Sequence, residues 1–374
     1  MKLEMLRNVA VIFILLLTLF LTGCWDVQEI KNRGIANAVF FDIGNPKKFK
    51  MGVVSTVPGS QAPTNVGTYQ QFNKRHFVIS GEGDSIAEAW TEAQANSFRD
   101  MFFGQIRAVV LSEKFARENI KDLLDFIGRI PLVPPNTIVL VAKGDPEKLL
   151  DMKNETNELP GNYIDFYFQS PSKRSLAIPV DLWRVNAILD RKTSDPYIPL
   201  FDESKGSYKI AGTAVFSGNH MVGELSMDET ITLALIRETD FGYLTIPLGK
   251  NKHAAFDNVR SNTIITPKIS SDRTLIFNVK TEIRGNLVEN IPHRETLVKE
   301  KKEIESQAEM LTKRKIENLI AKLQGLNSDP VGFGGQFRVE YPHQWDKIDW
   351  HQVYPAAEFN VSTKFTLRET GLFR

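Results

Sequence analysis

The first twenty-four residues constrain this chain most, because they decide where the rest of it folds. Lys2 and Arg7 precede an almost unbroken apolar run from Val9 to Phe20, and Leu21-Thr22-Gly23-Cys24 closes that run. A basic start, an apolar segment and small residues at the end are typical of a signal peptide. The apolar run would span about 18 Å as a helix, whereas a hydrocarbon core is about 30 Å thick. We therefore expect 1–23 to be a removed signal peptide and not a lasting transmembrane span.

Cys24 is the residue that the N-terminal pattern singles out. Leu-x-Gly-Cys is the lipobox of bacterial lipoproteins, in which the cysteine Sγ receives a diacylglycerol and the new N-terminus can also be acylated. Two acyl chains such as palmitate hold a protein at a membrane, whereas one chain binds only marginally. Cys24 is the only cysteine, so it has no partner for an intramolecular disulfide. We predict an S-diacylglycerol cysteine at Cys24 and no other cofactor; the alternative is an ordinary secretory peptide followed by a cysteine.

The net charge of the chain does not point to nucleic acid or anionic lipid as a partner. The chain has a formal net charge of +1, and removing 1–23 takes away Lys2, Arg7 and Glu4, which leaves 0. A neutral balance gives no drive toward nucleic acid and no polybasic patch for anionic lipid. The roughly 350 remaining residues exceed what one core usually organises, so two or three domains are expected.

The segment after Cys24 alternates strand-like and helix-like patterns. Short strand-like runs, with clear apolar alternation in 49–57, predict strands over 35–43, 49–57, 75–80, 105–111 and 137–142. Helical spacing predicts helices over 85–98, 112–129, 145–150 and 180–190, the first of which begins with the capping box Ser85-x-x-Glu88. We expect a mixed α/β domain over 24–195. Polar and turn-forming residues predict a surface loop at 58–71, a connector at 151–175 and a domain boundary within 192–206.

The second half of the chain predicts two more domains. A small middle domain over 205–258 would hold a hairpin of 208–216 and 221–225, a helix over 228–237 and a strand near 244–248. A C-terminal α+β domain over 259–374 would hold strands at 262–269, 273–284, 336–341 and 359–368. The longest helix, 294–326, carries one narrow apolar stripe, which favours the cover of an antiparallel sheet over a coiled-coil arm. The fold class is therefore α+β, with three mixed α/β domains and antiparallel and mixed sheets.

Two glycine-rich stretches bear comparison with phosphate-binding loops. Gly81-x-Gly83 precedes a helix, but Ile86 stands where the dinucleotide fingerprint has glycine or alanine, so a tight strand-to-helix turn is favoured. Gly332-Phe333-Gly334-Gly335 lacks the Gly-Lys-Ser/Thr of the phosphate loop, which favours a glycine-rich start of a strand.

Metal and acid/base sites are also weakly supported. His76, His220, His253, His293, His343 and His351 show no HExxH or other short metal-ligand spacing, so we expect no metal site. His343, Asp346, Asp349 and His351 gather near Trp345 and Trp350, where an acid/base group can be imagined. Aromatic packing with surface polar residues is favoured, because no nucleophile or oxyanion device accompanies them and no G-x-S-x-G occurs. We predict no catalytic residues and no enzymatic activity.

Several motifs in order resemble one family over nearly the whole chain. They are Gly23-Cys24-Trp25-Asp26-x-x-Glu29-Ile30, Ser80-x-x-Gly83-x-Ser85-x-x-Glu88-Ala89, Gly212-Thr213-Ala214-Val215-Phe216, Val222-Gly223-x-Leu225, Asp228-Glu229-Thr230, Asp329-Pro330-x-Gly332-Phe333 and Pro342-x-x-Trp345 with Trp350. Together they resemble the C-subunit lipoproteins of spore nutrient germinant receptors, Ger(x)C. Gln105 and Ser112 depart from the histidine and glycine that are usual there.

The resemblance implies a three-domain α+β protein, lipid-anchored on the outer face of the spore inner membrane. It would be a non-enzymatic subunit that docks on the membrane A and B subunits and enables nutrient-triggered germination. The alternative is a stand-alone surface lipoprotein that captures a ligand for a transporter. A cell-envelope enzyme is a third class, which no catalytic constellation supports.

Overall fold

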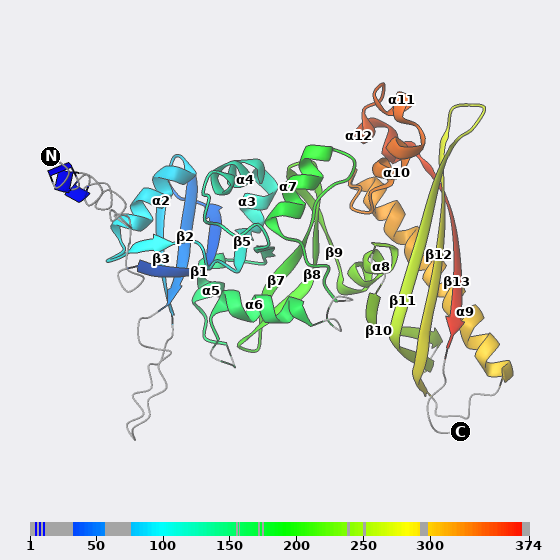
Figure 1. Ribbon diagram of the computed structural model, residues 1–374. Coiled ribbons are helices and arrows are strands. Elements are labelled where there is room, and N and C mark those ends of the chain that lie inside the picture. The colour runs from blue at the N-terminus through cyan, green and yellow to red at the C-terminus, as the bar shows by residue number, and fades with distance from the viewer. Residues whose placement is uncertain are drawn as a thin grey trace, which may run out of the picture.

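The structure is a computed structural model that describes residues 33–56, 76–154, 156, 158–170, 173, 176–237, 240–249, 252–291 and 298–368, with 4, 5, 7, 8, 10 and 11 near the N-terminus. Cys24, Trp25, Asp26, Glu29 and Ile30 lie outside the described residues, as do His293, the predicted loop at 58–71 and most of the predicted signal peptide. The described strands form two sheets that stand side by side with helices packed on them (Figure 1).

The first sheet has nine strands. They are β1 (Arg33–Ile43), β2 (Phe49–Thr56), β3 (His76–Gly83), β4 (Asp100–Phe102), β5 (Ala108–Ser112), β6 (Ile138–Ala142), β7 (Tyr197–Ser204), β8 (Ser207–Ser217) and β9 (His220–Leu225). The order is β3-β2-β1-β5-β6-β7-β8-β9, with β4 paired to β1. The central strands β1, β5, β6 and β7 are parallel, and antiparallel strands flank them. Because such central strands are covered on both faces, β5 and β6 are almost continuously apolar.

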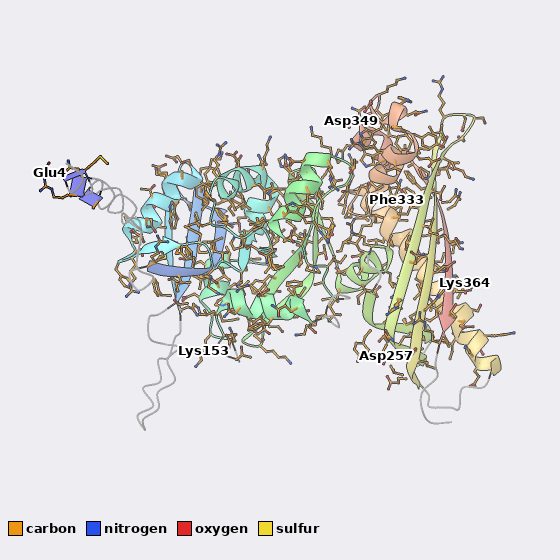
Figure 2. All side chains as sticks on the ribbon, in the orientation of Figure 1. Glu4, Lys153, Asp257, Phe333, Asp349 and Lys364 are labelled. Atoms are coloured by element: carbon orange, nitrogen blue, oxygen red, sulfur yellow. The ribbon has the colours of Figure 1, made fainter. Side chains whose placement is uncertain are left out.

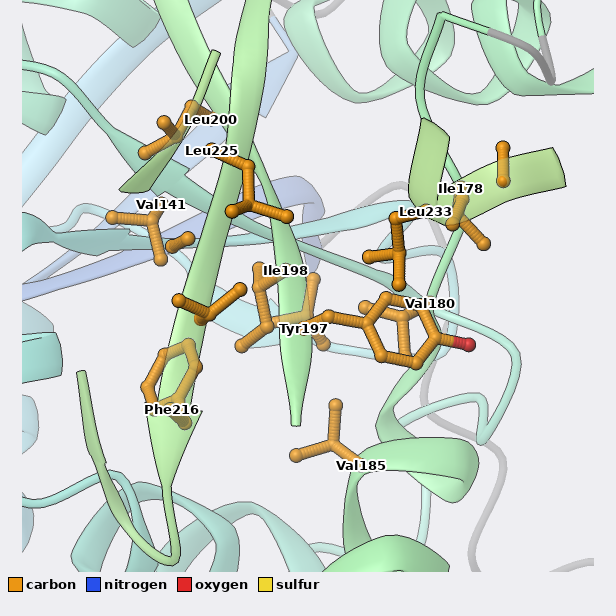
Figure 3. Close-up of a cluster of buried hydrophobic side chains, with 14 of the residues drawn as sticks. Val141, Ile178, Val180, Val185, Tyr197, Ile198, Leu200, Phe216, Leu225 and Leu233 are labelled. Atoms are coloured by element: carbon orange, nitrogen blue, oxygen red, sulfur yellow. The ribbon is translucent and has the colours of Figure 1, made fainter. Parts of the chain in front are cut away.

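Helices cover both faces of this sheet. They are α2 (Ile86–Ala95), α3 (Glu113–Glu118), α4 (Lys121–Gly128), α5 (Pro146–Asp151), α6 (Pro160–Gln169) and α7 (Leu182–Arg191). Alternation along each strand divides the core: Val39 and Val109 face one cluster, whereas Phe40 and Val110 face the other. Figure 3 shows part of the first cluster, where the ring of Tyr197 lies beside Val180.

Two predictions for this region need correction. The helix expected over 112–129 is two helices, because Asn119 is extended and the N–H of Ile120 donates to the carbonyl oxygen of Asn219 at 3.1 Å. The connector expected at 151–175 contains the helix α6, which begins at Pro160, a residue suited to a first helical turn.

The second sheet has four strands. β10 (Asp240–Gly249), β11 (Lys252–Ile269) and β12 (Leu275–Ile291) pair antiparallel, and β13 (Glu358–Leu367) pairs parallel to β12. Between β12 and β13 the chain forms α9 (Val298–Gly325), which carries it back so that β13 can run parallel to β12. Ile304, Ala308 and Leu323 are buried members of the predicted apolar stripe. The prediction that the long helix covers the C-terminal sheet is confirmed (Figure 1).

Helix α9 also closes the outer edge of this sheet. The N–H of Phe365 donates to Oε1 of Glu309 at 3.0 Å, and the N–H of Leu367 donates to Oε1 of Glu305 at 2.8 Å. Among the described strands β13 is an edge of this sheet, so the two carboxylates take the place of strand carbonyl groups for these donors.

The strand predicted over 336–341 is wrong. This segment lies in the helix α10 (Phe333–Glu340), which is followed by α11 (Pro342–Trp345), α12 (Trp350–Val353) and a 3-10 turn (Tyr354–Ala356). Helical spacing buries Phe333 and Phe337 together, whereas Val339 is 80% exposed. The apolar alternation of the sequence therefore does not describe which side chains are buried.

The middle segment of the sequence divides between the two sheets. Strands β8 and β9 extend the first sheet, and β10 and β11 begin the second. Helix α8 (Met227–Arg237) packs between them, against both β8 and β11 (Figure 1). The expected boundary segment, 192–206, contains β7, which pairs with β6 and β8 inside the first sheet. The division at 24–195, 205–258 and 259–374 stays a prediction.

Candidate functional site at the junction of the two sheets

A short segment between α9 and α10 is organised by the carboxylate of Asp329. This side chain accepts hydrogen bonds from the N–H groups of Gly332 at 2.8 Å, Phe333 at 3.0 Å and Gly334 at 2.9 Å. Nε1 of Trp350 donates to the same carboxylate at 3.2 Å. Gly332 has φ +91°, a conformation that side chains disfavour, so glycine is suited to the turn into α10. The Asp-Pro-x-Gly-Phe motif is thus a local capping device.

Asp195, at the start of β7, meets this segment from the first sheet. Its carboxylate accepts from the N–H of Asp329 at 2.7 Å and from the N–H of Gly218 at 2.7 Å. Its own N–H donates to the carbonyl oxygen of Asp329 at 2.9 Å. The two aspartates therefore join the two halves of the chain by reciprocal hydrogen bonds, with both side chains buried. We call Asp195, Gly218, Asp329 and Trp350 the aspartate junction.

Four more contacts, made by the side chains of Ser328 and Arg237, reinforce the aspartate junction. Ser328 Oγ donates to the carbonyl oxygen of Phe216 at 2.6 Å. The Arg237 guanidinium donates to the carbonyl oxygens of Pro330 and Val331, the latter at 3.0 Å. The guanidinium also lies 4.5 Å from the ring centroid of Tyr197, within cation–π range.

Burial controls the acidity of these carboxyl groups. It raises the pKa of Asp329 to about 7, although the backbone N–H donors of α10 act in the opposite direction. It also raises the pKa of Asp195, against the hydrogen bonds from Asp329 and Gly218. Desolvation likewise raises the pKa of Tyr354, and the nearby aspartates add to this effect. The hydrogen bonds described above to the carboxylates of Asp195 and Asp329 come from backbone N–H groups or from a tryptophan, so the geometry is that of a structural clamp.

A cleft of about 470 Å³ opens beside the aspartate junction. It is lined by Leu189, Lys192, Ser194, Asp195, Gly218, Asn219, Trp345, Ile348, Asp349, Trp350 and His351. Nε2 of His351 lies 3.5 Å from Oδ1 of Asp195, and Nδ1 of His351 lies 3.4 Å from Oγ of Ser217. The lining thus combines indole faces with carboxylates and one imidazole.

The predicted cluster near the tryptophans is only partly brought together. Asp349 caps α12 by accepting from the N–H of His351 at 3.1 Å, whereas His343 and Asp346 are exposed. Trp350 is 4% exposed and lies 5.8 Å from Trp345 between ring centroids. The aromatic packing interpretation is confirmed. Figure 2 labels Phe333 and Asp349 at this end of the second sheet.

The Gly81-x-Gly83 stretch lies inside β3, under α2. A Cβ at Gly81 would come 2.4 Å from the N of Ala93, and one at Gly83 would come 2.4 Å from the N of Ala89. Both glycines therefore let helix and strand approach closely. The predicted N-cap forms, because the N–H of Glu88 donates to Ser85 Oγ at 3.1 Å, while the Glu88 carboxylate accepts from the N–H of Asp84 at 2.7 Å, one residue before the N-cap. Close packing explains the glycines without a nucleotide.

The Asp228-Glu229-Thr230 motif ties α8 to α9. Glu229 and Ser226 bond reciprocally at the start of α8, at 2.7 and 3.3 Å. Nζ of Lys322 binds the Glu229 carboxylate at 2.8 Å, and Nζ of Lys315 binds Asp228 at 2.5 Å. Burial raises the pKa of Glu229, but Lys322 and Ser226 lower it, and the net direction is downward.

Two further findings concern only the described ranges. No group of three His, Cys, Asp or Glu side chains there is placed to hold a metal ion. None of the helices there is long and apolar enough to cross a membrane. Cys24, the one site residue that the sequence predicts, lies outside these ranges and stays a prediction.

Comparisons with known proteins cover almost the entire chain. Residues 26–203 match the spore germination protein N-terminal domain, and residues 211–371 match the spore germination B3/GerAC-like C-terminal domain. Spore germination protein B3 of Bacillus subtilis (strain 168) is 24% identical over 97% of each chain. Spore germination protein YndF of the same organism is 26% identical over 99% of each chain.

Two further relatives agree with these matches. Spore germination protein KC of Bacillus subtilis (strain 168) is 24% identical over 96% of this chain and 95% of its own. The crystal structure of the GerBC protein matches the fold with a TM-score of 0.59 and 20% identity, over 91% of this chain and 99% of that one. The predicted mixed α/β fold class is confirmed by that likeness. The chain therefore belongs to the family of spore germination B3/GerAC-like proteins, and the predicted relation to the Ger(x)C subunits is confirmed.

Proposed function

We propose that this chain is a lipid-anchored, non-enzymatic subunit of a spore nutrient germinant receptor. Diacylglycerol on Cys24 holds it at the outer face of the spore inner membrane, and its folded body docks on the membrane A and B subunits. The observation that carries the proposal is the match of both family domains over nearly the full chain, together with the Leu21–Cys24 lipobox.

The aspartate junction supports a docking role. It ties the two sheets through buried hydrogen bonds, at 2.7 and 2.9 Å between Asp195 and Asp329. A body joined in this way can present surfaces from both sheets in a fixed relation to one partner assembly. The lipid adds to docking because a tether raises the effective concentration of the body beside membrane-embedded partners.

Co-purification tests the docking. A C-terminally tagged chain is isolated from detergent-solubilised spore membranes, and A and B subunits are sought in the eluate. We expect both subunits with the wild-type chain. A receptor that assembles and localises normally in spores lacking this chain would overturn the proposal.

Metabolic labelling tests the anchor. Labelled palmitate should enter the wild-type chain and Gly23→Ala, which keeps a small residue before the cysteine, but not Cys24→Ala. Membrane retention and labelling of Cys24→Ala would contradict the anchor.

The second candidate function is ligand capture by a stand-alone surface lipoprotein. The cleft beside the aspartate junction favours it, because about 470 Å³ lies within the size range of small-molecule sites. Calorimetry of the ectodomain, residues 25–374, against amino acids and sugars separates the two candidates. Micromolar binding supports capture, and no heat of binding supports the docking subunit.

A further inference from the structure

A small aromatic and basic surface lies at the beginning of the first sheet. Phe98, just before β4, is 72% exposed. Its ring centroid lies 5.1 Å from the Arg99 guanidinium and 6.1 Å from the ring of the half-buried Phe77. On the same strand, the ring of Phe102 lies 5.2 Å from the guanidinium of Arg33. We call Arg33, Phe77, Phe98, Arg99 and Phe102 the β4 patch.

The backbone fixes the place of the β4 patch. β4 pairs parallel to the first residues of β1, with Arg33 opposite Asp100 and Ile35 opposite Phe102. Met101 packs against Gly34, where an added Cβ would come 2.7 Å from its sulfur. The patch therefore sits on ordered backbone where β1 begins, and the exposed carboxylate of Asp100 is the acidic group on the strand itself.

This position is also the part of the fold closest along the chain to the proposed lipid. Arg33 is nine residues after Cys24, a length that reaches at most about 30 Å when fully extended. The second sheet stands at the opposite end of the molecule (Figure 1). A lipid on Cys24 thus keeps Arg33, where the β4 patch begins, within about 30 Å of the bilayer surface.

We infer that the β4 patch is a membrane-contacting surface, which takes the headgroups and upper acyl chains of anionic phospholipid. The inference rests on the proposed lipid anchor at Cys24. It adds a second contact to it, so that the body is oriented on the bilayer as well as tethered to it.

The chemistry of the patch fits this partner. A guanidinium binds a lipid phosphate with two parallel N–H donors, and its aliphatic stem lies along apolar surface while the charge stays in the headgroup layer. An exposed Phe ring gains free energy when it enters the boundary between headgroups and acyl chains. Arg99 and Phe98 are held together, so both interactions can be made at one point. The tether supplies the proximity that so small a patch could not supply alone.

Because the chain has a single cysteine, the proposed membrane contact can be tested by site-specific labelling. When Cys24 carries lipid, Phe98→Cys gives the chain one free thiol, to which a polarity-sensitive fluorophore is attached. The control is Val339→Cys, which labels an 80% exposed apolar position on α10. Both lipidated proteins are placed in vesicles of phosphatidylglycerol and phosphatidylethanolamine, with or without a nitroxide-bearing lipid, and in phosphatidylcholine vesicles.

The expected result is a blue-shifted emission at position 98 and a quenching by nitroxide lipid several-fold greater than at position 339. Arg99→Ser in the Phe98→Cys background should reduce the quenching, as should phosphatidylcholine vesicles. Equal, water-like emission at both positions, with the protein floating with the vesicles, would overturn the inference and leave the anchor intact. Failure of the wild-type protein to float, or labelling of its Cys24 thiol, would instead overturn the anchor and the orientation that depends on it.

Discussion

The packing around the aspartate junction predicts that alanine has different effects on stability at two adjacent glycines of α10. Gly334 packs against the loop between α7 and β7 and against α12: an added Cβ would lie 2.8 Å from the carbonyl oxygen of Thr193 and 2.9 Å from Cε2 of Trp350. At Gly335, the nearest neighbour of an added Cβ is Oγ1 of Thr193 at 3.8 Å, which is ordinary contact. Gly334→Ala and Gly335→Ala are therefore the same chemical change in the same helix, with opposite packing consequences.

The magnitude follows from the contacts. Relief of the Gly334→Ala clash needs a movement of roughly 0.6 Å in buried backbone, and overpacking of this kind costs about 1–3 kcal/mol. Displacement of Trp350 also weakens its 3.2 Å hydrogen bond to Asp329, at about 1 kcal/mol. Replacing glycine by alanine within a helix returns about 1 kcal/mol. We expect Gly334→Ala to lower the free energy of unfolding by about 1–3 kcal/mol, and Gly335→Ala to leave it unchanged or raise it by up to about 1 kcal/mol.

Equilibrium unfolding in guanidinium chloride, followed by tryptophan fluorescence, measures both variants against the wild-type protein. Trp345 and Trp350 lie at the junction and report on it directly. Equal unfolding free energies for the two variants would refute the close approach of α10 to Thr193. A loss confined to a separate transition of the second sheet would show that the junction does not couple the two halves.

Three further outcomes are expected. Gly81→Ala should push α2 away from β3, which lowers the free energy of unfolding by about 1–3 kcal/mol and lowers the thermal midpoint. Gly128→Ala, with open space around its Cβ, should be neutral or stabilising, and differential scanning calorimetry compares the two variants. Burial raises the pKa of Asp329 to about 7, so its stabilising contribution is present below about pH 4 and is lost as the pH rises through 7. The unfolding free energy in urea should fall over this range by at most roughly 1.4 kcal/mol per pH unit, and an equal slope in Asp329→Asn would count against this. Lys322→Met should cost only about 0.5–1 kcal/mol, because its pair with Glu229 is half-exposed; a larger loss would assign that pair a greater role.

The sequence predicts elements well where one periodic pattern dominates. The β8–β9 hairpin, α8 and the stripe of α9 follow from the local pattern of the sequence, although α8 packs against both sheets. The segment 336–341 fails because its alternation is compatible with a strand, while the burial of Phe333 and Phe337 depends on contacts with distant rings such as Phe277. Tertiary packing decides between the two patterns there.

The aspartate junction could not be predicted from the sequence. Asp195 and Asp329 are 134 residues apart, and each is surrounded by residues typical of turns. The motif Asp329-Pro330-x-Gly332-Phe333 is visible in the sequence as a family feature, but its capping role depends on the N–H groups that begin α10, and the sequence predicts a strand at 336–341 in place of that helix. Asp195 carries no motif, and the segment around it, 192–206, predicts a domain boundary and not a buried contact. The helical spacing of Phe333 and Phe337 is the local signal in the sequence that favours a helix over the strand predicted at 336–341.

The two glutamates of α9 that bind the edge of β13 bear on the proposed attachment of this chain to a membrane surface. Tethered proteins diffuse in two dimensions and collide often, and an open strand edge would let neighbouring copies join their sheets end to end. Glu305 and Glu309 already occupy the N–H groups of Leu367 and Phe365, and their negative charge repels the same edge of another copy. With the proposed lipid on Cys24, neighbouring copies on a membrane would therefore meet a β13 edge whose N–H groups at Phe365 and Leu367 are already bound, which disfavours the joining of two sheets there.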